Sequence, residues 1–261
     1  MFESVWQILP HDEAGSGPAV VLLHAGIADR TMWSEHLEPL AAAGYRAVAM
    51  DLSGFGEAAV APGEQAPWID VLATMDALEL HEAALVGNSF GGAVALRVAV
   101  VAPPRVSALA LISAPAPGVD PSSSLEEAWA AEEAALDRGD LDAAVAAVLE
   151  TWTLPDAPTE LRDRVATMQR RAYEQQVDAE DLEDAPDPVE DDPGVLNGLD
   201  VPALVAVGDQ DKPEFRRGAE VLAQSLPRAR LEIIEGAGHL APLEAAEAFR
   251  ELLLGFLRKR A

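Results

Sequence analysis

A strand that turns sharply into a helix constrains this chain more than any other feature. Residues 84–86 form a short apolar run typical of a buried strand, Gly87-Asn88-Ser89-Phe90-Gly91 follows, and a small-residue helix pattern begins at Gly92. A serine on such a turn projects its hydroxyl outward, so the residues two positions away must lack bulk. The Phe90 N–H would lie at a helix N-terminus, where it can stabilise an oxyanion. Taken alone, the motif also fits a glycine-rich turn with a solvated serine.

Length and charge limit the class of protein. A chain of 261 residues, 49% of them apolar, can bury the core of one α/β domain with an inserted subdomain, and two independent domains are less favoured. The formal charge of −27 disfavours binding to nucleic acid or to an anionic membrane, which requires clustered Lys and Arg. We therefore expect a small-molecule substrate and no nucleic-acid or membrane partner.

The sequence contains no cysteine, which excludes disulfides, thiolate nucleophiles and zinc–thiolate sites. The N-terminus lacks an apolar segment of signal-peptide length, and charged residues or prolines interrupt every apolar stretch. We expect a soluble cytoplasmic protein, monomer or homodimer, without a cofactor or a metal.

Short apolar runs alternate with helix patterns along most of the chain. Residues 2–9 suit a first edge strand and 11–15 suit a turn. Further strands are predicted at 19–23, 46–50, 106–113, 203–207 and 230–234, with helices at 31–43 and 67–80, after Pro213, and at about 243–259. This alternation predicts an α/β fold with a mostly parallel central sheet flanked by helices.

The composition changes between the fifth and sixth of these strands. Residues 115–199 are rich in Pro, Asp and Glu, with helix patterns at 125–138, 141–151 and 159–177 and no strand-like run. We expect a core of residues 1–114 and 200–261 and an all-helical cap of residues 115–199 above Ser89. Its acidic stretch 180–192 resembles a solvated linker, and Trp129 and Trp152 are expected in the core of the cap.

Two further loops follow predicted strands in the first third of the chain. His24-Ala25-Gly26 comes after the run 19–23, and such a loop can supply a second N–H to an oxyanion, although a tight turn explains it equally well. Asp51 also stands at a strand end, where a carboxylate commonly orders a following glycine loop. We favour that structural role for Asp51.

Asp211 and His239 each follow a predicted strand, as Ser89 does. In a parallel sheet all three reach the same edge, where α/β proteins place their sites. Asp209 competes with Asp211, which we prefer because the carboxylate must clear the strand end to reach a histidine on the neighbouring loop. A metal site at His11, beside Asp12 and Glu13, is disfavoured against a solvated loop, and His36 and His81 suit core or surface positions.

Through these motifs the chain resembles the α/β-hydrolase superfamily, and the insert resembles that family's cap domain. The resemblance implies that Ser89 is a nucleophile, His239 its general base and then acid, and Asp211 the group that orients the imidazole. It also implies oxyanion donors at the N–H groups of Gly26 and Phe90. The chain departs from the family at Ala25, where the family usually has glycine.

A serine nucleophile implies attack on a carbonyl and a covalent acyl-enzyme. The elbow Gly-Asn-Ser-x-Gly-Gly is similar to those of capped carbon–carbon bond hydrolases, lactonases and carboxylesterases. Residues 240–244 are similar to the corresponding segment of enol-lactonase and small esterase relatives. We therefore expect a serine hydrolase acting on a carboxylic ester or lactone of a small, largely apolar substrate. The alternatives are a carbon–carbon bond hydrolase of diketone-type substrates and a non-catalytic small-molecule-binding protein.

Overall fold

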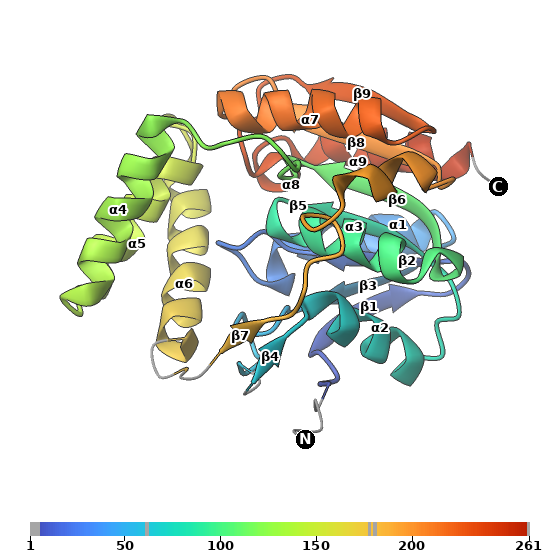
Figure 1. Cartoon of the computed structure of the whole chain (residues 1–261), viewed down its shortest axis with the longest axis horizontal. Coiled ribbons are helices and arrows are strands. Elements are labelled where there is room, and N and C mark those ends of the chain that lie inside the picture. The colour runs from blue at the N-terminus through green and yellow to red at the C-terminus, as the bar shows by residue number, and fades with distance from the viewer. Residues whose placement is uncertain (1–5, 61–62, 177–178, 180–181, 260–261) are drawn as a thin grey trace.

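The computed structural model describes residues 6–60, 63–176, 179 and 182–259, and a seven-stranded sheet lies at its centre (Figure 1). The strands are β1 (His11–Gly15), β2 (Ala19–Leu23), β3 (Arg46–Met50), β5 (Ala83–Asn88), β6 (Val106–Ile112), β8 (Ala203–Gly208) and β9 (Ala229–Ile234). Their order is β1-β3-β2-β5-β6-β8-β9, and every neighbouring pair except β1 and β3 is parallel. The mostly parallel sheet that the sequence predicts is confirmed.

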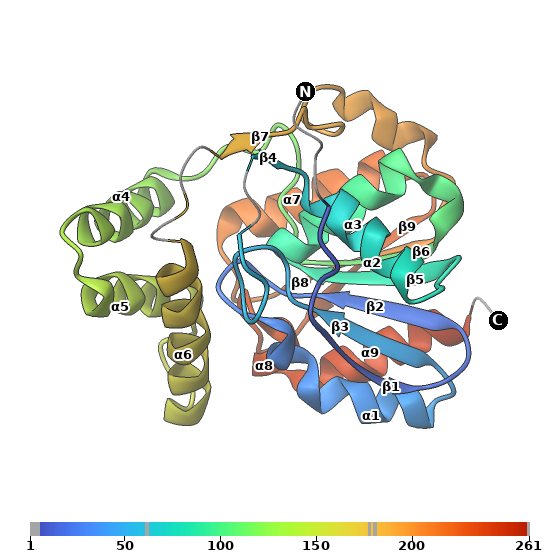
Figure 2. The ribbon, with the colours of Figure 1, turned by 90° about the horizontal axis from the view of Figure 1, so that it is seen from below.

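Helices cover both faces of the sheet (Figure 2). They are α1 (Ser34–Ala42), α2 (Pro67–Ala77), α3 (Phe90–Val101), α7 (Pro213–Ser225), α8 (Ala241–Glu244) and α9 (Ala246–Arg258), with 3-10 turns at Arg30–Trp33, Pro103–Arg105 and Pro193–Gly198. The side chains of α2, α3 and α7 share one apolar cluster with the sheet, and those of α1 and α9 share another. Because both faces are covered, the inner strands are continuous Val, Ala, Leu and Ile runs rather than alternating ones.

The topology places several loops at one edge of the sheet. The chain leaves β2 to form β3 on one side and then forms β5, β6, β8 and β9 on the other side. The strand order therefore reverses between β2 and β5, and the carboxyl ends of the strands on either side of such a reversal flank a crevice. Residues that follow β2, β5, β8 and β9 meet there.

Three helices of the insert pack on one another beside that edge (Figure 1). They are α4 (Ser123–Asp137), α5 (Leu141–Trp152) and α6 (Thr159–Gln176). Contrary to the prediction of no strand, β7 (Glu183–Asp184) pairs in parallel with β4 (Glu64–Gln65). These two short strands contain no apolar residue, so no hydrophobic pattern marks them.

The first edge strand lies later in the chain than predicted. Of residues 2–9, positions 2–5 lie outside the described residues and 6–9 form no strand, whereas 11–15, predicted as a turn, form β1. An edge strand needs only backbone pairing on one side, so its polar side chains can face solvent. Here Arg46 Nη2 lies 2.7 Å from Glu13 Oε2 across the antiparallel pair.

The acidic stretch 180–192 is exposed to solvent at most of its described positions, as expected, but it also contacts the core. The Asp187 carboxylate accepts a hydrogen bond of 2.7 Å from Arg97 Nε on α3, and Val189 is buried. Burial opposes ionisation of Asp187, but bonds from Arg97 and two backbone N–H groups leave its pKa below the ordinary value. This stretch is therefore anchored to the core.

The last predicted helix is two helices. Residues 243–259 divide between α8 and α9, and Ala245 separates them with a non-helical backbone at φ −132° and ψ 51°. Within the described ranges, no helix combines the length and the apolar character needed to cross a membrane.

Candidate active site

Ser89 occupies a strained turn between β5 and α3. Its φ is 52° and its ψ −116°, and its N–H donates a 2.8 Å hydrogen bond to the Ile112 carbonyl. A Cβ atom on Gly87 would lie 2.2 Å from the Gly91 carbonyl oxygen, and one on Gly91 would lie 2.3 Å from that of Leu23. A side chain at either position would clash with the backbone, so both positions require glycine, as the sequence motif predicts.

The side chains of Ser89, His239 and Asp211 form a continuous hydrogen-bonded series. His239 Nε2 lies 2.8 Å from Ser89 Oγ, and His239 Nδ1 lies 3.1 Å from Asp211 Oδ1. His239 and Asp211 are each only 5% exposed. Because Nδ1 faces a carboxylate, it carries the proton, and Nε2 is left to accept one from the serine hydroxyl.

Asp209, the alternative partner for His239, bonds a backbone group instead. Asp209 Oδ1 accepts a 2.8 Å hydrogen bond from the Gly236 N–H, at the start of the loop that carries His239. Asp211 turns toward the imidazole and also accepts a 2.8 Å bond from the Lys212 N–H. The structure therefore brings Asp211, and not Asp209, into contact with His239.

Gly26 and Phe90, the predicted oxyanion donors, lie side by side. A Cβ atom on Gly26 would lie 3.5 Å from Phe90 Cβ. Among the described residues, neither backbone N–H has a protein acceptor. Two adjacent N–H groups without a protein acceptor, next to a serine hydroxyl, can stabilise a developing oxyanion.

His24 fixes the peptide that carries the Gly26 N–H. Its Nε2 accepts a 2.9 Å bond from the Leu52 N–H, so in the neutral ring Nδ1–H donates to the Ala25 carbonyl at 2.8 Å. In a trans peptide the carbonyl and the following N–H point in opposite directions, so holding the Ala25 oxygen orients the Gly26 N–H. Burial lowers the pKa of His24, which keeps the ring neutral.

Asp51 orders the glycine loop that follows it, as expected, and it also bonds the loop that follows β2. The fully buried carboxylate accepts bonds from the Arg30 N–H at 2.7 Å and the Glu57 N–H at 2.8 Å, and it also pairs with the Arg30 guanidinium. Arg30 in turn contacts Asp12 at 3.0 Å and Glu57 at 2.8 Å. This network connects the loops that follow β2 and β3.

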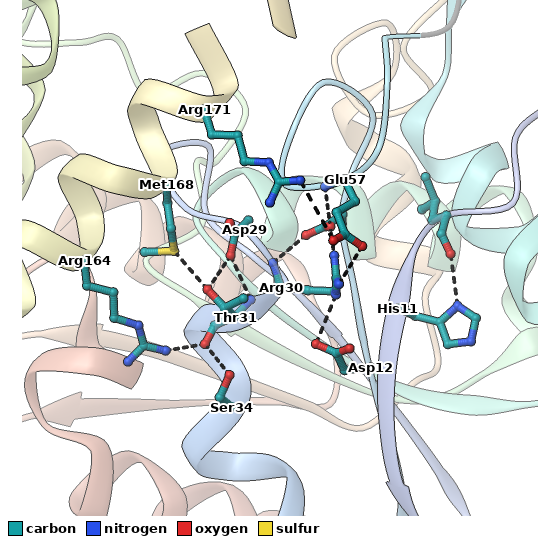
Figure 3. Close-up of polar contacts among 12 residues, drawn as sticks. His11, Asp12, Asp29, Arg30, Thr31, Ser34, Glu57, Arg164, Met168 and Arg171 are labelled. Carbon is teal, nitrogen blue, oxygen red and sulfur yellow. Dashed lines mark hydrogen bonds and ion pairs between the residues drawn. The ribbon is translucent and has the colours of Figure 1, made fainter. Parts of the chain in front are cut away.

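Helix α6 of the insert contacts the same loops (Figure 3). Arg164 donates to the Thr31 carbonyl, Thr31 Oγ1 donates to the sulfur of Met168 at 3.5 Å, and Arg171 lies 3.9 Å from Glu57. Gln175 donates to the Gly56 carbonyl at 2.5 Å. These contacts seat the insert over the carboxyl edge of the sheet.

Aromatic rings enclose His239. The ring centroid of Trp152, the last residue of α5, lies 4.5 Å from that of His239, and the Phe215 centroid lies 4.4 Å away. The core position expected for the insert tryptophans is wrong for Trp129, which is 43% exposed. Trp152 is buried in the apolar cluster of the insert, as expected, and its ring also packs against the imidazole.

Sequence motifs alone did not identify every residue that contacts His239 or its loop. Phe215 follows Asp211 within one helical turn, which is a usable signal, whereas nothing local marks Trp152. Glu244 lies in a segment that the motifs include, but its contacts with the His239 loop are visible only in three dimensions.

His11 and His36 bond backbone carbonyl groups and do not form a metal site with the other described residues. His11 Nδ1 bonds the Leu9 carbonyl, and buried His36 Nε2 donates to the Pro242 carbonyl at 2.9 Å. Over the part of the chain that the structure describes, no three His, Asp or Glu side chains are arranged to hold a metal ion.

A family model described as "alpha/beta hydrolase fold" matches residues 18–246. Among solved structures, a thermophilic esterase from Thermogutta terrifontis is 27% identical, with a TM-score of 0.78 over 97% of this chain and 93% of that one. The enol-lactonase from Burkholderia xenovorans LB400 is 25% identical, with a TM-score of 0.78 over 96% of both chains.

Two curated relatives carry different activities in their names. The chain is 31% identical to the dihydrolipoyllysine-residue acetyltransferase component of the acetoin cleaving system of Pseudomonas putida, over 93% of its own length but only 64% of that protein. It is 28% identical to a 2-hydroxymuconate semialdehyde hydrolase of Pseudomonas sp. strain CF600, over 95% of this chain and 89% of the relative.

Proposed function

The chain belongs to the alpha/beta hydrolase fold family, and from this premise we propose that it is a serine hydrolase that cleaves a carboxylic ester or lactone. The observation that carries the proposal is the contact of His239 with Ser89 at 2.8 Å on one ring nitrogen and with Asp211 at 3.1 Å on the other. This arrangement deprotonates a serine hydroxyl as it attacks a carbonyl.

The reaction follows from the positions of these groups. Ser89 Oγ attacks the ester carbonyl while His239 Nε2 takes its proton, and the N–H groups of Gly26 and Phe90 receive the oxyanion. The tetrahedral adduct expels the alcohol, which takes the proton from His239, and leaves an acyl-serine. Water then attacks the acyl group, with His239 again accepting and returning the proton.

The surroundings favour a small, largely apolar substrate. Trp152, Phe215 and Phe90 present apolar rings near the serine and histidine. The similarity to an esterase and an enol-lactonase over nearly the whole chain supports the same substrate class.

The experiment compares the parent protein with Ser89→Ala. The parent should hydrolyse short-chain p-nitrophenyl esters and react with a fluorophosphonate probe. Ser89→Ala should lose both, and Asp211→Asn should lose at least about a hundredfold in kcat with little change in KM. Ser16→Ala, on an exposed turn, is the matched control and should retain both reactions.

A parent that binds small molecules but neither hydrolyses esters nor reacts with the probe would contradict the proposal and favour the non-catalytic alternative. The similarity to a 2-hydroxymuconate semialdehyde hydrolase makes carbon–carbon bond hydrolysis the second candidate. Turnover of a ring-cleavage diketone with a higher kcat/KM than any ester would favour that candidate, also through Ser89.

A further inference from the structure

The Glu244 carboxylate bonds backbone groups on both sides of His239. Its Oε2 accepts a 2.8 Å bond from the Gly238 N–H and a 3.2 Å bond from the Leu240 N–H. Its Oε1 accepts a bond of 3.4 Å from the Leu154 N–H. One side chain at the end of α8 therefore connects the loop that carries the imidazole with the segment of the insert that follows α5.

The same part of the insert contacts the imidazole directly. Leu154 lies two residues after Trp152, whose ring packs 4.5 Å from that of His239. The Leu154 side chain also covers Gly238, because a Cβ atom on Gly238 would lie 2.9 Å from Leu154 Cδ2. Side chains of the insert thus pack against the His239 loop, and Glu244 connects the backbones of the two segments by hydrogen bonds.

We propose that Glu244 is a positioning residue that couples the position of the insert on the core to the orientation of His239. This inference rests on the proposed function, because it concerns how the general base is held. Bonds from N–H groups to a carboxylate are stronger than neutral ones. Without Glu244, the Gly238 and Leu240 N–H groups lose their acceptor, and the bond from Asn88 Nδ2 to the His239 carbonyl at 3.1 Å does not replace it.

Electrostatics supports a role other than stability. Burial raises the pKa of Glu244 in spite of the N–H groups that it bonds. The folded state therefore favours the protonated form more than the unfolded state does, so ionisation of Glu244 lowers the stability as the pH rises. A neutral replacement should preserve stability while it disturbs the geometry.

The test uses Glu244→Gln, in which an amide nitrogen replaces one of the two acceptor oxygens. Gln can accept from the His239 loop or from the Leu154 N–H, but not from both. We expect kcat for a p-nitrophenyl ester and the rate of fluorophosphonate labelling each to fall about tenfold, with KM changed less than about twofold. The thermal midpoint should stay within about 3 °C of the parent. Glu247→Gln, at an exposed position three residues later, is the matched control and should match the parent in every measurement.

Hydrogen exchange supplies a readout that does not depend on activity. In Glu244→Gln, amides of residues 152–154 and 238–240 should exchange faster together, whereas Glu247→Gln should leave both segments unchanged. Wild-type kcat and wild-type exchange in Glu244→Gln would overturn the inference, and so would a loss of kcat that only follows a loss of folded protein. A parent without Ser89-dependent hydrolysis would instead overturn the proposed function, and faster exchange in both segments would then still support the coupling.

Discussion

His36 shows how a buried residue contributes to the response of the fold to acid. It is 1% exposed between Trp33 and Phe249, and burial lowers its pKa below the ordinary value of 6.5. As the pH falls below 6.5, the unfolded chain takes up a proton that the folded chain does not, so stability is present above that pH and is lost below it. His36→Gln should remove up to about 1.4 kcal/mol per pH unit from the slope of unfolding free energy against pH between 6.5 and 5.

The measurement is urea denaturation at a series of pH values. His24 is buried and neutral as well, so part of the slope should remain in His36→Gln. His81→Gln, at an exposed histidine, is the matched control and should retain the parent slope. An unchanged slope in His36→Gln would show that His36 is not the group that titrates.

At the level of elements, α3 holds the acidic stretch of the insert through Arg97, which pairs with Asp187 and, at 3.7 Å, with Glu190. Arg97 contacts Asp187 at 2.7 Å through Nε and at 2.5 Å through Nη2, with a side chain only 11% exposed. Asp187 Oδ1 then bonds the N–H groups of Val189 and Glu190. Arg97→Ala should release this stretch and speed cleavage within 183–192 by a protease specific for Glu and Asp, by about tenfold.

The control is Arg228→Ala, because Arg228 pairs with Asp200 at 3.5 Å between side chains that are 51% and 86% exposed. Such an exposed pair contributes little, so cleavage in Arg228→Ala should match the parent. Equal cleavage rates in Arg97→Ala and the parent would mean that Val189 and its apolar neighbours hold the stretch without the ion pair.

At the scale of the whole molecule, the net charge of −27 opposes the compact state. Repulsion among exposed carboxylates is screened by salt, whose Debye length falls to a few ångströms at molar concentration. We expect the thermal midpoint to rise by about 5 °C between 0.05 and 0.5 M NaCl, as measured by scanning calorimetry.

Charge reversal on α4 tests the cause of that rise. Glu126, Glu127 and Glu133 are exposed, and a triple substitution to Lys replaces one negative by one positive charge at each position. This variant should show a smaller salt effect than the parent, whereas the triple substitution to Asp, which keeps the charge, should show the same effect. A midpoint that falls with salt in the parent would mean that favourable ion pairs outweigh the repulsion.

Local pattern in the sequence determined the buried strands, the turn at Ser89 and the order of the candidate residues. A run such as Ala203–Gly208 reads as a strand because burial on both faces requires apolar side chains at every position. The need for glycine at positions 87 and 91 could be predicted because the clash that excludes a Cβ atom arises within the turn and the adjacent strand. β1 was missed because an edge strand is stabilised by backbone pairing with β3 and carries no apolar signature.

Only the tertiary structure decided which groups contact His239. Asp209 and Asp211 follow the same strand two residues apart, and the turn between them directs one carboxylate to Gly236 and the other to the imidazole. Trp152 reaches His239 because the insert folds back over the sheet edge, and Glu244 reaches Leu154 for the same reason. The periodicity of apolar residues along the sequence does not predict a contact between residues that are distant in the chain. Such a contact depends on how whole helices and strands pack.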